Sequence, residues 1–175
     1  MKTTLYAFLS ALIISFLIYS CENENNNNEN ETYLIISGKL TNNSECKDLK
    51  SSNLTSEISD TLSCVDYSFN ANTNTLTITH INAGFNCCPD SLYCKISKNI
   101  DTIIIQEFEK IPQCNCNCLY DLDIEINGVE SKKYQIKFIE PYVGEQGKLE
   151  FEIDLKNNEI GSYCVTRKQY PWGIF

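Results

Sequence analysis

The chain is poor in positive charge and has a single histidine. Of its 175 residues, 14 are Lys or Arg and 23 are Asp or Glu, which gives a formal net charge of −9. No cluster of Lys and Arg interrupts this acidic character, so the protein would be repelled by a phosphate backbone. We therefore expect no nucleic-acid partner.

Motifs of the common enzyme classes are also absent. The chain contains no His-Glu-x-x-His, Gly-x-Ser-x-Gly, Gly-x-Gly-x-x-Gly or P-loop sequence, and no thioredoxin-like Cys-x-x-Cys. These absences predict a non-catalytic protein without a cofactor or a metal, acting as a binding or structural module for an unidentified protein or glycan. The alternative is a secreted enzyme, or a metal or redox protein that uses the cysteines.

A long hydrophobic run lies at the N-terminus. It covers residues 5–19 behind the positive charge of Lys2, and it is too short for a membrane span. It ends in Leu17-Ile18-Tyr19-Ser20-Cys21, which resembles the lipobox of bacterial lipoproteins. The resemblance implies that residues 1–20 are a lipoprotein signal peptide and that the thiol of Cys21 carries a lipid. The alternative is an ordinary signal peptide followed by an unrelated cysteine.

Residues 21–32 begin with this cysteine and continue as a run of Glu and Asn. Such a segment has too little apolar surface to fold, so we expect a disordered tether. Its acidic start resembles the surface-export signal of Bacteroides-type lipoproteins. We therefore expect a protein held in the outer membrane of the cell envelope by acyl chains such as palmitate, on the periplasmic or the surface face.

Alternation of apolar and polar residues dominates residues 33–175, which suit a single domain. Seven or eight short strands with turn signals between them predict an all-β, antiparallel β-sandwich of immunoglobulin-like kind, with a small barrel as the alternative. The stretch 100–108 is apolar on both faces, which is typical of a central strand. Residues 47–59 fit no strand pattern. The other strands are expected at 33–40, 64–69, 76–81, 121–126, 133–138 and 148–155.

Two hairpins can be predicted, the second of them with its register. Strands 64–69 and 76–81 flank an Asn-rich turn at residues 70–74. A second hairpin would join the strands on either side of residues 127–131. A two-residue turn there would put Lys133 on the core face, whereas a five-residue loop pairs Ile124 with Tyr134 and sets Glu125 against Lys133. The pattern therefore favours the five-residue loop.

Ten cysteines less Cys21 leave nine, and an exported chain enters an oxidising compartment where disulfides are the default. Because nine is odd, at most four bridges can form within one chain and one thiol is left over. A metal–thiolate site and a redox enzyme are the alternatives. The disulfide candidates are Cys46, Cys64, Cys87, Cys88, Cys94, Cys114, Cys116, Cys118 and Cys164.

Three of these cysteines alternate with other residues, as Cys114-x-Cys116-x-Cys118. If the segment is extended, they share the core face with Tyr120 and Leu122. Alternate strand residues are about 6.6 Å apart, near the upper limit for the Cα separation of a disulfide. We therefore expect no bridge within this group and at least one bridge to the group nearest in sequence. That group is Cys87, Cys88 and Cys94.

The single histidine, His80, shares a strand face with Leu76 and Ile78. We expect a packed or hydrogen-bonded strand residue, with a base paired to a cysteine nucleophile as the alternative. Alternating carboxylates at Asp121, Asp123 and Glu125 indicate a solvated strand face rather than a calcium site, because no Gly-turned loop gathers their oxygens. Aromatic residues near the C-terminus form either an exposed patch or a tail docked on the core. They are Tyr170, Trp172 and Phe175.

Two stretches resemble signatures of uncharacterised cysteine-rich lipoproteins from Bacteroides-type bacteria. They are His-Ile-Asn-Ala-Gly-Phe-Asn-Cys-Cys-Pro at 80–89 and Cys-Asn-Cys-Asn-Cys-Leu-Tyr-Asp-Leu at 114–122. The resemblance covers most of residues 64–173 and implies a secreted β-rich domain, but no activity. Three short Asp-Thr/Ser-apolar tripeptides also resemble the O-glycosylation signal of these bacteria. The residues that would be modified are Thr61, Ser91 and Thr102.

Overall fold

The computed structural model describes residues 35–47, 58–169 and 171–172, which contain nine β-strands. Our predictions for the signal peptide, Cys21, the tether and the domain limits lie outside these residues, as does most of the segment 47–59. None of the described residues forms a helix that is long and apolar enough to cross a membrane. The strands are β1 (Ser37–Asn43), β2 (Leu62–Asn70), β3 (Thr75–Asn86), β4 (Pro89–Asn99), β5 (Thr102–Pro112), β6 (Asn117–Asn127), β7 (Lys133–Ile139), β8 (Glu150–Asp154) and β9 (Ile160–Thr166).

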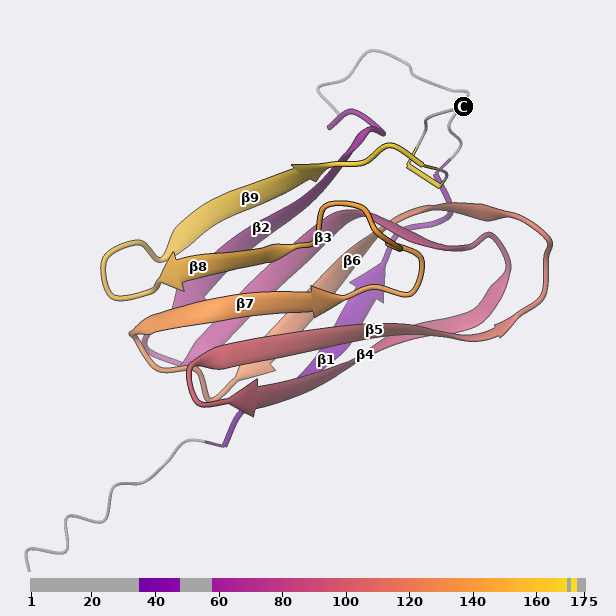
Figure 1. The fold of residues 1–175 in the computed structure, drawn as a ribbon. Coiled ribbons are helices and arrows are strands. Elements are labelled where there is room, and N and C mark those ends of the chain that lie inside the picture. The colour runs from indigo at the N-terminus through magenta and orange to yellow at the C-terminus, as the bar shows by residue number, and fades with distance from the viewer. Residues whose placement is uncertain (1–34, 48–57, 170, 173–175) are drawn as a thin grey trace, which may run out of the picture. The chain divides into compact units, whose positions relative to one another are not determined.

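The strands form two sheets that pack face to face, with the order β1-β6-β3-β2-β9 in one and β4-β5-β7-β8 in the other (Figure 1). The predicted β-sandwich is confirmed. Neighbouring strands are antiparallel except β5 and β7, which run parallel with Ile103 opposite Ile136. This pair arises because the chain leaves the sheet after β5, forms β6 in the other sheet and returns as β7. The interior position of β5 agrees with its two apolar faces.

Alternate side chains from both sheets fill the core. The main core cluster includes Ile78 of β3 and Ile105 of β5, both essentially inaccessible to solvent. Each such side chain contributes about 1.5–3 kcal/mol on burial. A second core cluster lies further along β3 and β6, and His80 stands between the two clusters in the sequence of β3. The second cluster consists of Ala83, Phe85, Cys118, Tyr120 and Leu122.

The first predicted hairpin is confirmed. Strands β2 and β3 pair antiparallel across the Asn-rich turn, with Phe69 opposite Leu76 and Tyr67 opposite Ile78. Asn74 in this turn has a φ of 53°, a left-handed conformation that asparagine adopts more readily than most residues. The alternating strands expected at 133–138 and 148–155 are also present, as β7 and β8.

The second predicted hairpin is wrong. Strands β6 and β7 lie in different sheets, so Ile124 faces Leu40 and Ile78 rather than Tyr134. The side chain of Lys133 lies 3.0 Å from Glu152 of β8 instead of beside Glu125. The alternating pattern fixes which side chains of each strand face the core, but it does not fix which strand is the neighbour. Two strands in opposite sheets satisfy the pattern as well as a hairpin does.

Candidate functional site

Four disulfides join eight of the nine cysteines in the domain, and the ninth, Cys94, is a free thiol. This result agrees with the four bridges and one thiol expected from an odd number. The bridges are Cys46–Cys118, Cys64–Cys164, Cys87–Cys116 and Cys88–Cys114.

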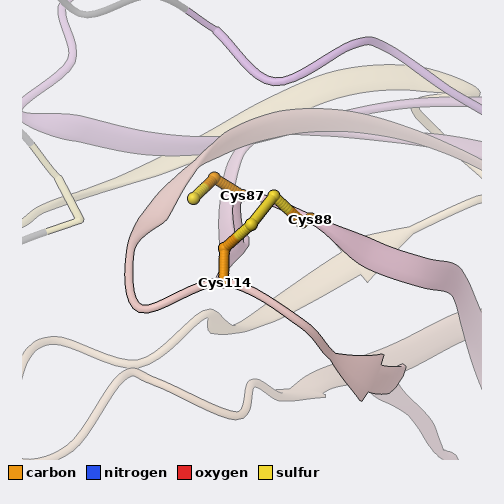
Figure 2. Close-up of side chains that lie close together, drawn as sticks. All are labelled: Cys87, Cys88 and Cys114. Atoms are coloured by element: carbon orange, nitrogen blue, oxygen red, sulfur yellow. A yellow bond between two sulfur atoms is a disulfide. The ribbon is translucent and has the colours of Figure 1, made fainter.

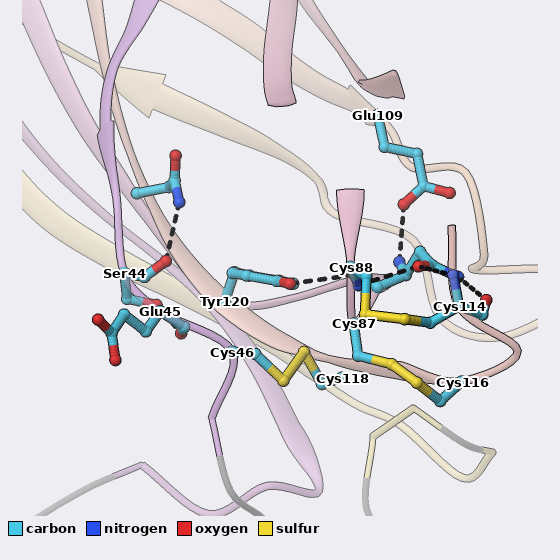
Figure 3. The surroundings of a disulfide bond; sticks show 12 residues. Ser44, Glu45, Cys46, Cys87, Cys88, Glu109, Cys114, Cys116, Cys118 and Tyr120 are labelled. Atoms are coloured by element: carbon cyan, nitrogen blue, oxygen red, sulfur yellow. Dashed lines mark hydrogen bonds between the residues drawn. A yellow bond between two sulfur atoms is a disulfide. The ribbon is translucent and has the colours of Figure 1, made fainter. Parts of the chain in front are cut away.

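Two of the bridges gather where the turn from β3 to β4 meets the connection from β5 to β6 (Figures 2 and 3). We call the residues Cys87, Cys88, Cys114 and Cys116 the cysteine cluster. The Cα atoms are 5.7 Å apart in Cys87–Cys116 and 5.4 Å apart in Cys88–Cys114. The prediction of at least one bridge between the two cysteine groups is confirmed, and two such bridges are present.

Cys118, the third cysteine of the alternating run, is not part of the cysteine cluster. Strand β6 begins only at Asn117, and the chain bends at Cys114 and Asn115. We predicted that all three cysteines face the core. Cys118 does, with 4% exposure, whereas Cys114 is half-buried and Cys116 is exposed. The partner of Cys118 is Cys46, which lies outside the group that we expected to supply it. No bridge forms within the run itself, as its spacing predicts.

Asn86 fixes the backbone around the cysteine cluster. Its side-chain Oδ1 accepts hydrogen bonds from the amides of Cys88 at 2.9 Å and Cys114 at 3.3 Å, and its Nδ2 donates to the carbonyl of Cys114 at 2.5 Å. Its own amide donates to Glu109 Oε2 at 2.7 Å, and its carbonyl accepts from the hydroxyl of Tyr120 at 3.0 Å. Figure 3 shows these bonds around the two bridges. The two chain segments are thus held together by polar contacts as well as by sulfur.

An open cleft of about 430 Å³ lies beside the cysteine cluster, and Cys114 and Cys116 line it. Tyr142, also in the lining, donates a hydrogen bond of 2.5 Å to Glu109 Oε1. That bond, together with burial, raises the pKa of Tyr142 to about 12. Tyr142 therefore remains a protonated phenol at neutral pH and is poorly suited to act as a base.

The free thiol of Cys94 is half-buried against the main core cluster, opposite Glu107 of β5. Burial and the charge of Glu107 raise the pKa of Cys94 to about 11. A thiol with such a pKa contains very little thiolate at neutral pH, and thiolate is the reactive form. Cys94 therefore behaves as a packing residue and not as a nucleophile.

His80 lies in a buried polar network between the two sheets. Its Nδ1 is 2.7 Å from Glu107 Oε1 on β5, and its Nε2 is 2.9 Å from Ser63 Oγ on β2. His80 and Ser63 are fully buried and Glu107 is 3% exposed. The expected packed, hydrogen-bonded histidine is confirmed, and its partners are a serine and a carboxylate rather than a cysteine.

The only arginine of the chain completes this network. Arg167 follows β9 and is fully buried, and its Nη2 donates to both carboxylate oxygens of Glu140 at 2.7 Å. The same nitrogen lies 3.3 Å from Ser63 Oγ. The network of Ser63, His80, Glu107, Glu140 and Arg167 thus contains two carboxylates and two basic side chains. Its charges balance when the imidazole is protonated, which reduces the cost of burying them.

The C-terminal segment packs on this network. Trp172 is fully buried, its ring centroid lies 4.8 Å from the guanidinium carbon of Arg167, and its Nε1 donates to the carbonyl of Asn82 at 2.8 Å. A Cβ at Gly84 would come within 2.8 Å of the indole ring, so the close approach requires glycine. Trp172 is therefore part of a docked tail and not of an exposed patch. Tyr170 and Phe175 are outside the described residues.

A β-bulge in β3 separates the two core clusters. The register with β6 shifts between His80 and Ala83, and Asn82 has a φ of 63°. The Asn82 side chain donates to the carbonyl of Leu62 at 2.7 Å and accepts from Lys47 Nζ at 2.9 Å. Residues three positions apart in a regular strand point to opposite faces. The bulge inserts one extra residue, so that His80 and Ala83 both face the core.

Charged neighbours decide the protonation of the imidazole. Burial lowers the pKa of His80, but the carboxylates of Glu107 and Glu140 outweigh burial and the opposing charge of Arg167, so the pKa lies above the ordinary 6.5. Burial also raises the pKa of Glu107, against the lowering effect of His80. Because both pKa values are raised, the pair of His80 and Glu107 retains a proton as the pH rises toward neutrality.

We expect the single imidazole to titrate with a midpoint above pH 6.5 in the folded protein. A pKa that is raised on folding stabilises the fold fully below the unfolded value, and that stabilisation is lost as the pH rises through the folded value. NMR of the His80 ring protons against pH measures the midpoint, and urea unfolding over the same range should show stability falling through it. A midpoint below 6.5 in the folded protein would show a neutral imidazole and contradict this charge assignment.

The order Ser63, His80, Glu107 matches the hydrogen bonds of a nucleophile–base–carboxylate triad. However, Ser63 is fully buried and Arg167 already approaches its Oγ. A substrate carbonyl would have to displace the docked C-terminal segment or separate the sheets to reach this oxygen. The network can therefore hold a proton and connect the sheets, but it does not present a nucleophile to a substrate.

Four members of the network were not predicted from the sequence: Ser63, Glu107, Glu140 and Arg167. Glu107 had a usable signal, because it continues the inward parity of Ile103 and Ile105 along β5. Glu140 and Arg167 directly follow the last residues of β7 and β9, where no periodic pattern assigns a side chain to a face.

The other predicted candidates lie on the surface or at strand ends. Asp121 Oδ1 lies 2.6 Å from Lys47 Nζ, and Asp123 Oδ1 accepts from Thr79 at 2.9 Å, which fits a hydrogen-bonded strand face better than a calcium site. The candidate glycosylation residues differ in exposure. Ser91 is exposed on β4, whereas Thr61 and Thr102 are half-buried.

Comparison of this chain with protein-family models, with curated proteins and with solved structures finds no match. The resemblance to cysteine-rich lipoproteins therefore stays a prediction, and the fold and the geometry of the site are the basis for a functional proposal.

Proposed function

We propose that this chain is a lipid-anchored protein of the outer cell envelope whose β-sandwich acts as a non-catalytic binding or structural module. The observation that carries the proposal is that the potentially reactive side chains are bonded to other side chains of the domain. Eight cysteines are joined in bridges, and the imidazole of His80 and the hydroxyl of Ser63 bond each other inside the core. These groups are bonded to one another within the fold instead of being free to meet a substrate.

The disulfides support the exported location. Bridges form and persist in oxidising compartments such as the periplasm and the cell surface, and each contributes typically about 2–4 kcal/mol. A domain with four bridges is suited to a compartment without the reducing systems of the cytosol. The signal-like run at residues 5–19 and the lipobox at Cys21 point to the same place.

An exposed aromatic pair supports a binding role. Tyr93 of β4 is 41% exposed and stacks on Phe108 of β5, with 5.0 Å between ring centroids and an interplanar angle of 10°. Lys95 Nζ lies 5.3 Å from the centroid of the same Phe108 ring. Tyrosine with an apolar body and a polar tip is enriched where proteins meet partners. We place the contact with a protein or glycan partner on this outer face of β4 and β5.

Anchoring through Cys21 is expected to be visible in cells. The protein should incorporate labelled palmitate and partition into the detergent phase, whereas Cys21→Ser should do neither, because the thioether acceptor is gone. Labelling and phase partitioning in the natural host measure both. The matched control is Cys94→Ser, which removes the one unbridged cysteine of the domain and should leave labelling intact.

Two results would contradict the proposal separately. A Cys21→Ser protein that remains labelled and membrane-bound would refute the anchor. Labelling of Ser63 in the folded protein by a fluorophosphonate, a reagent for activated serines, would show an accessible nucleophile and favour the enzyme alternative instead.

A further inference from the structure

We infer that the cysteine cluster is also a thiolate site for one soft divalent metal ion, such as Zn²⁺, once its two bridges are reduced. The ligands would be the sulfur atoms of Cys87, Cys88, Cys114 and Cys116. This inference concerns the reduced state of the domain and does not depend on the lipid anchor or on a binding partner.

The sulfur atoms already converge. Those of Cys87, Cys88 and Cys114 all lie within 4.8 Å of one another (Figure 2). The sulfur of Cys116 is bonded to that of Cys87 (Figure 3). Tetrahedral zinc with Zn–S bonds of about 2.3 Å requires sulfur atoms about 3.8 Å apart. Side-chain rotation alone covers a difference of this size, so four thiolates could surround one ion without a change in backbone path.

The backbone of the cluster is held by more than sulfur. Pairing of β3 with β6 continues to Asn86 and Asn117, and pairing of β4 with β5 continues to Pro89 and Pro112. The amide of Cys87 also donates to the carbonyl of Cys116 at 3.1 Å. The hydrogen bonds of Asn86 join the same two segments. Reduction would therefore leave the four thiols close together instead of releasing two free loops.

The bend at Cys114 and Asn115 removes the main geometric objection to a metal. In an extended strand, alternate cysteines would be about 6.6 Å apart along one face and poorly placed for a single ion. Instead, Cys114 and Cys116 lie in the connection before β6, and each reaches one of the adjacent residues Cys87 and Cys88.

Both bridges of the cysteine cluster are accessible to a reductant. Cys116 is exposed, the other three cysteines of the cluster are half-buried, and the open cleft runs beside them. A dithiol can reduce each bridge by giving two electrons and two protons, and itself becomes a disulfide. The metal ion then displaces protons from the thiols as it binds.

The test uses the purified full mature protein in mild detergent, with Cd²⁺ as the probe because its thiolate complexes absorb in the ultraviolet. A water-soluble phosphine, which is oxidised to its oxide as it reduces a disulfide, is added in limiting amount. We expect one Cd²⁺ bound per chain, the absorption band of cadmium thiolates, and loss of four thiols from titration with a thiol reagent. Binding should also raise the melting temperature of the reduced protein.

Variants separate this site from binding by stray thiols. Cys114→Ser with Cys116→Ser should weaken Cd²⁺ binding at least tenfold, whereas the matched control Cys94→Ser should bind as tightly as the parent. A reduced, folded protein that binds no Cd²⁺ would overturn the inference, as would undiminished binding in the double variant. If reduction unfolds the domain, Cd²⁺ should restore its β-sheet circular dichroism, and failure to do so would also overturn the inference.

Discussion

Replacing Arg167 by methionine is expected to lower the free energy of unfolding by about 3–5 kcal/mol. The guanidinium is fully buried and holds both oxygens of Glu140, which is 8% exposed. Without it, a carboxylate would remain inside the domain, and among the described residues its only other nearby counter-charge is the imidazole of His80, 3.9 Å away. Domains of this size are stable by about 5–15 kcal/mol, so the loss would be a large part of the total. Urea unfolding of the oxidised protein measures it.

Two controls identify the cause. Arg167→Met combined with Glu140→Gln should recover a large part of the loss, because the unpaired buried charge is removed along with its partner. Lys137→Met removes a basic residue paired with Glu150 at 2.9 Å on the exposed sheet face, and should cost no more than about 1 kcal/mol. Equal effects of Arg167→Met and Lys137→Met would refute the structural role of the network.

Removal of the Cys64–Cys164 bridge by a double substitution with alanine should cost about 3–5 kcal/mol. These cysteines are direct partners across β2 and β9 and are separated by 100 residues, so the bridge constrains a long loop of the unfolded chain. The other bridges shorten that loop, but most of it remains. The thermal midpoint and the urea midpoint of the oxidised variant give the size of the effect.

The comparison is with Cys88→Ala and Cys114→Ala. This bridge spans 26 residues, and Cys87–Cys116 already closes almost the same loop, so its removal should cost about 1 kcal/mol. A larger loss for this pair than for the Cys64–Cys164 pair would show that the cysteine cluster is held mainly by its sulfur bonds, and that Asn86 and the strand pairing contribute little.

The presence of the strands could be predicted well because buried and exposed side chains alternate along them. In β7, Tyr134, Ile136 and Phe138 are buried and the residues between them are more exposed, and the same alternation defines β8. The turn before β3 was also predictable, since asparagine tolerates the left-handed conformation of Asn74. These are local properties, readable within about ten residues.

Strand pairing was less predictable for a physical reason. Residues 127–132 carry the chain from one sheet to the other, and Val129 is buried on the way, with its amide bonded to the carbonyl of Asn74. A hairpin and a crossing of this kind bury the same apolar residues of β6 and β7. The choice depends on contacts with β5 and β8, which are distant in sequence.

Local periodicity and residue counts were enough to establish the all-β class, the alternating core faces, and the arithmetic of four bridges and one thiol. The tertiary structure was needed to establish that Cys118 joins Cys46 beside the pairing of β1 with β6, and that Cys94 stays free. It was also needed to establish that the only arginine and the only histidine meet two carboxylates inside the core. The two carboxylates come from one sheet and the two basic residues from the other, so they approach one another only when both sheets are in place, and no local pattern encodes that arrangement.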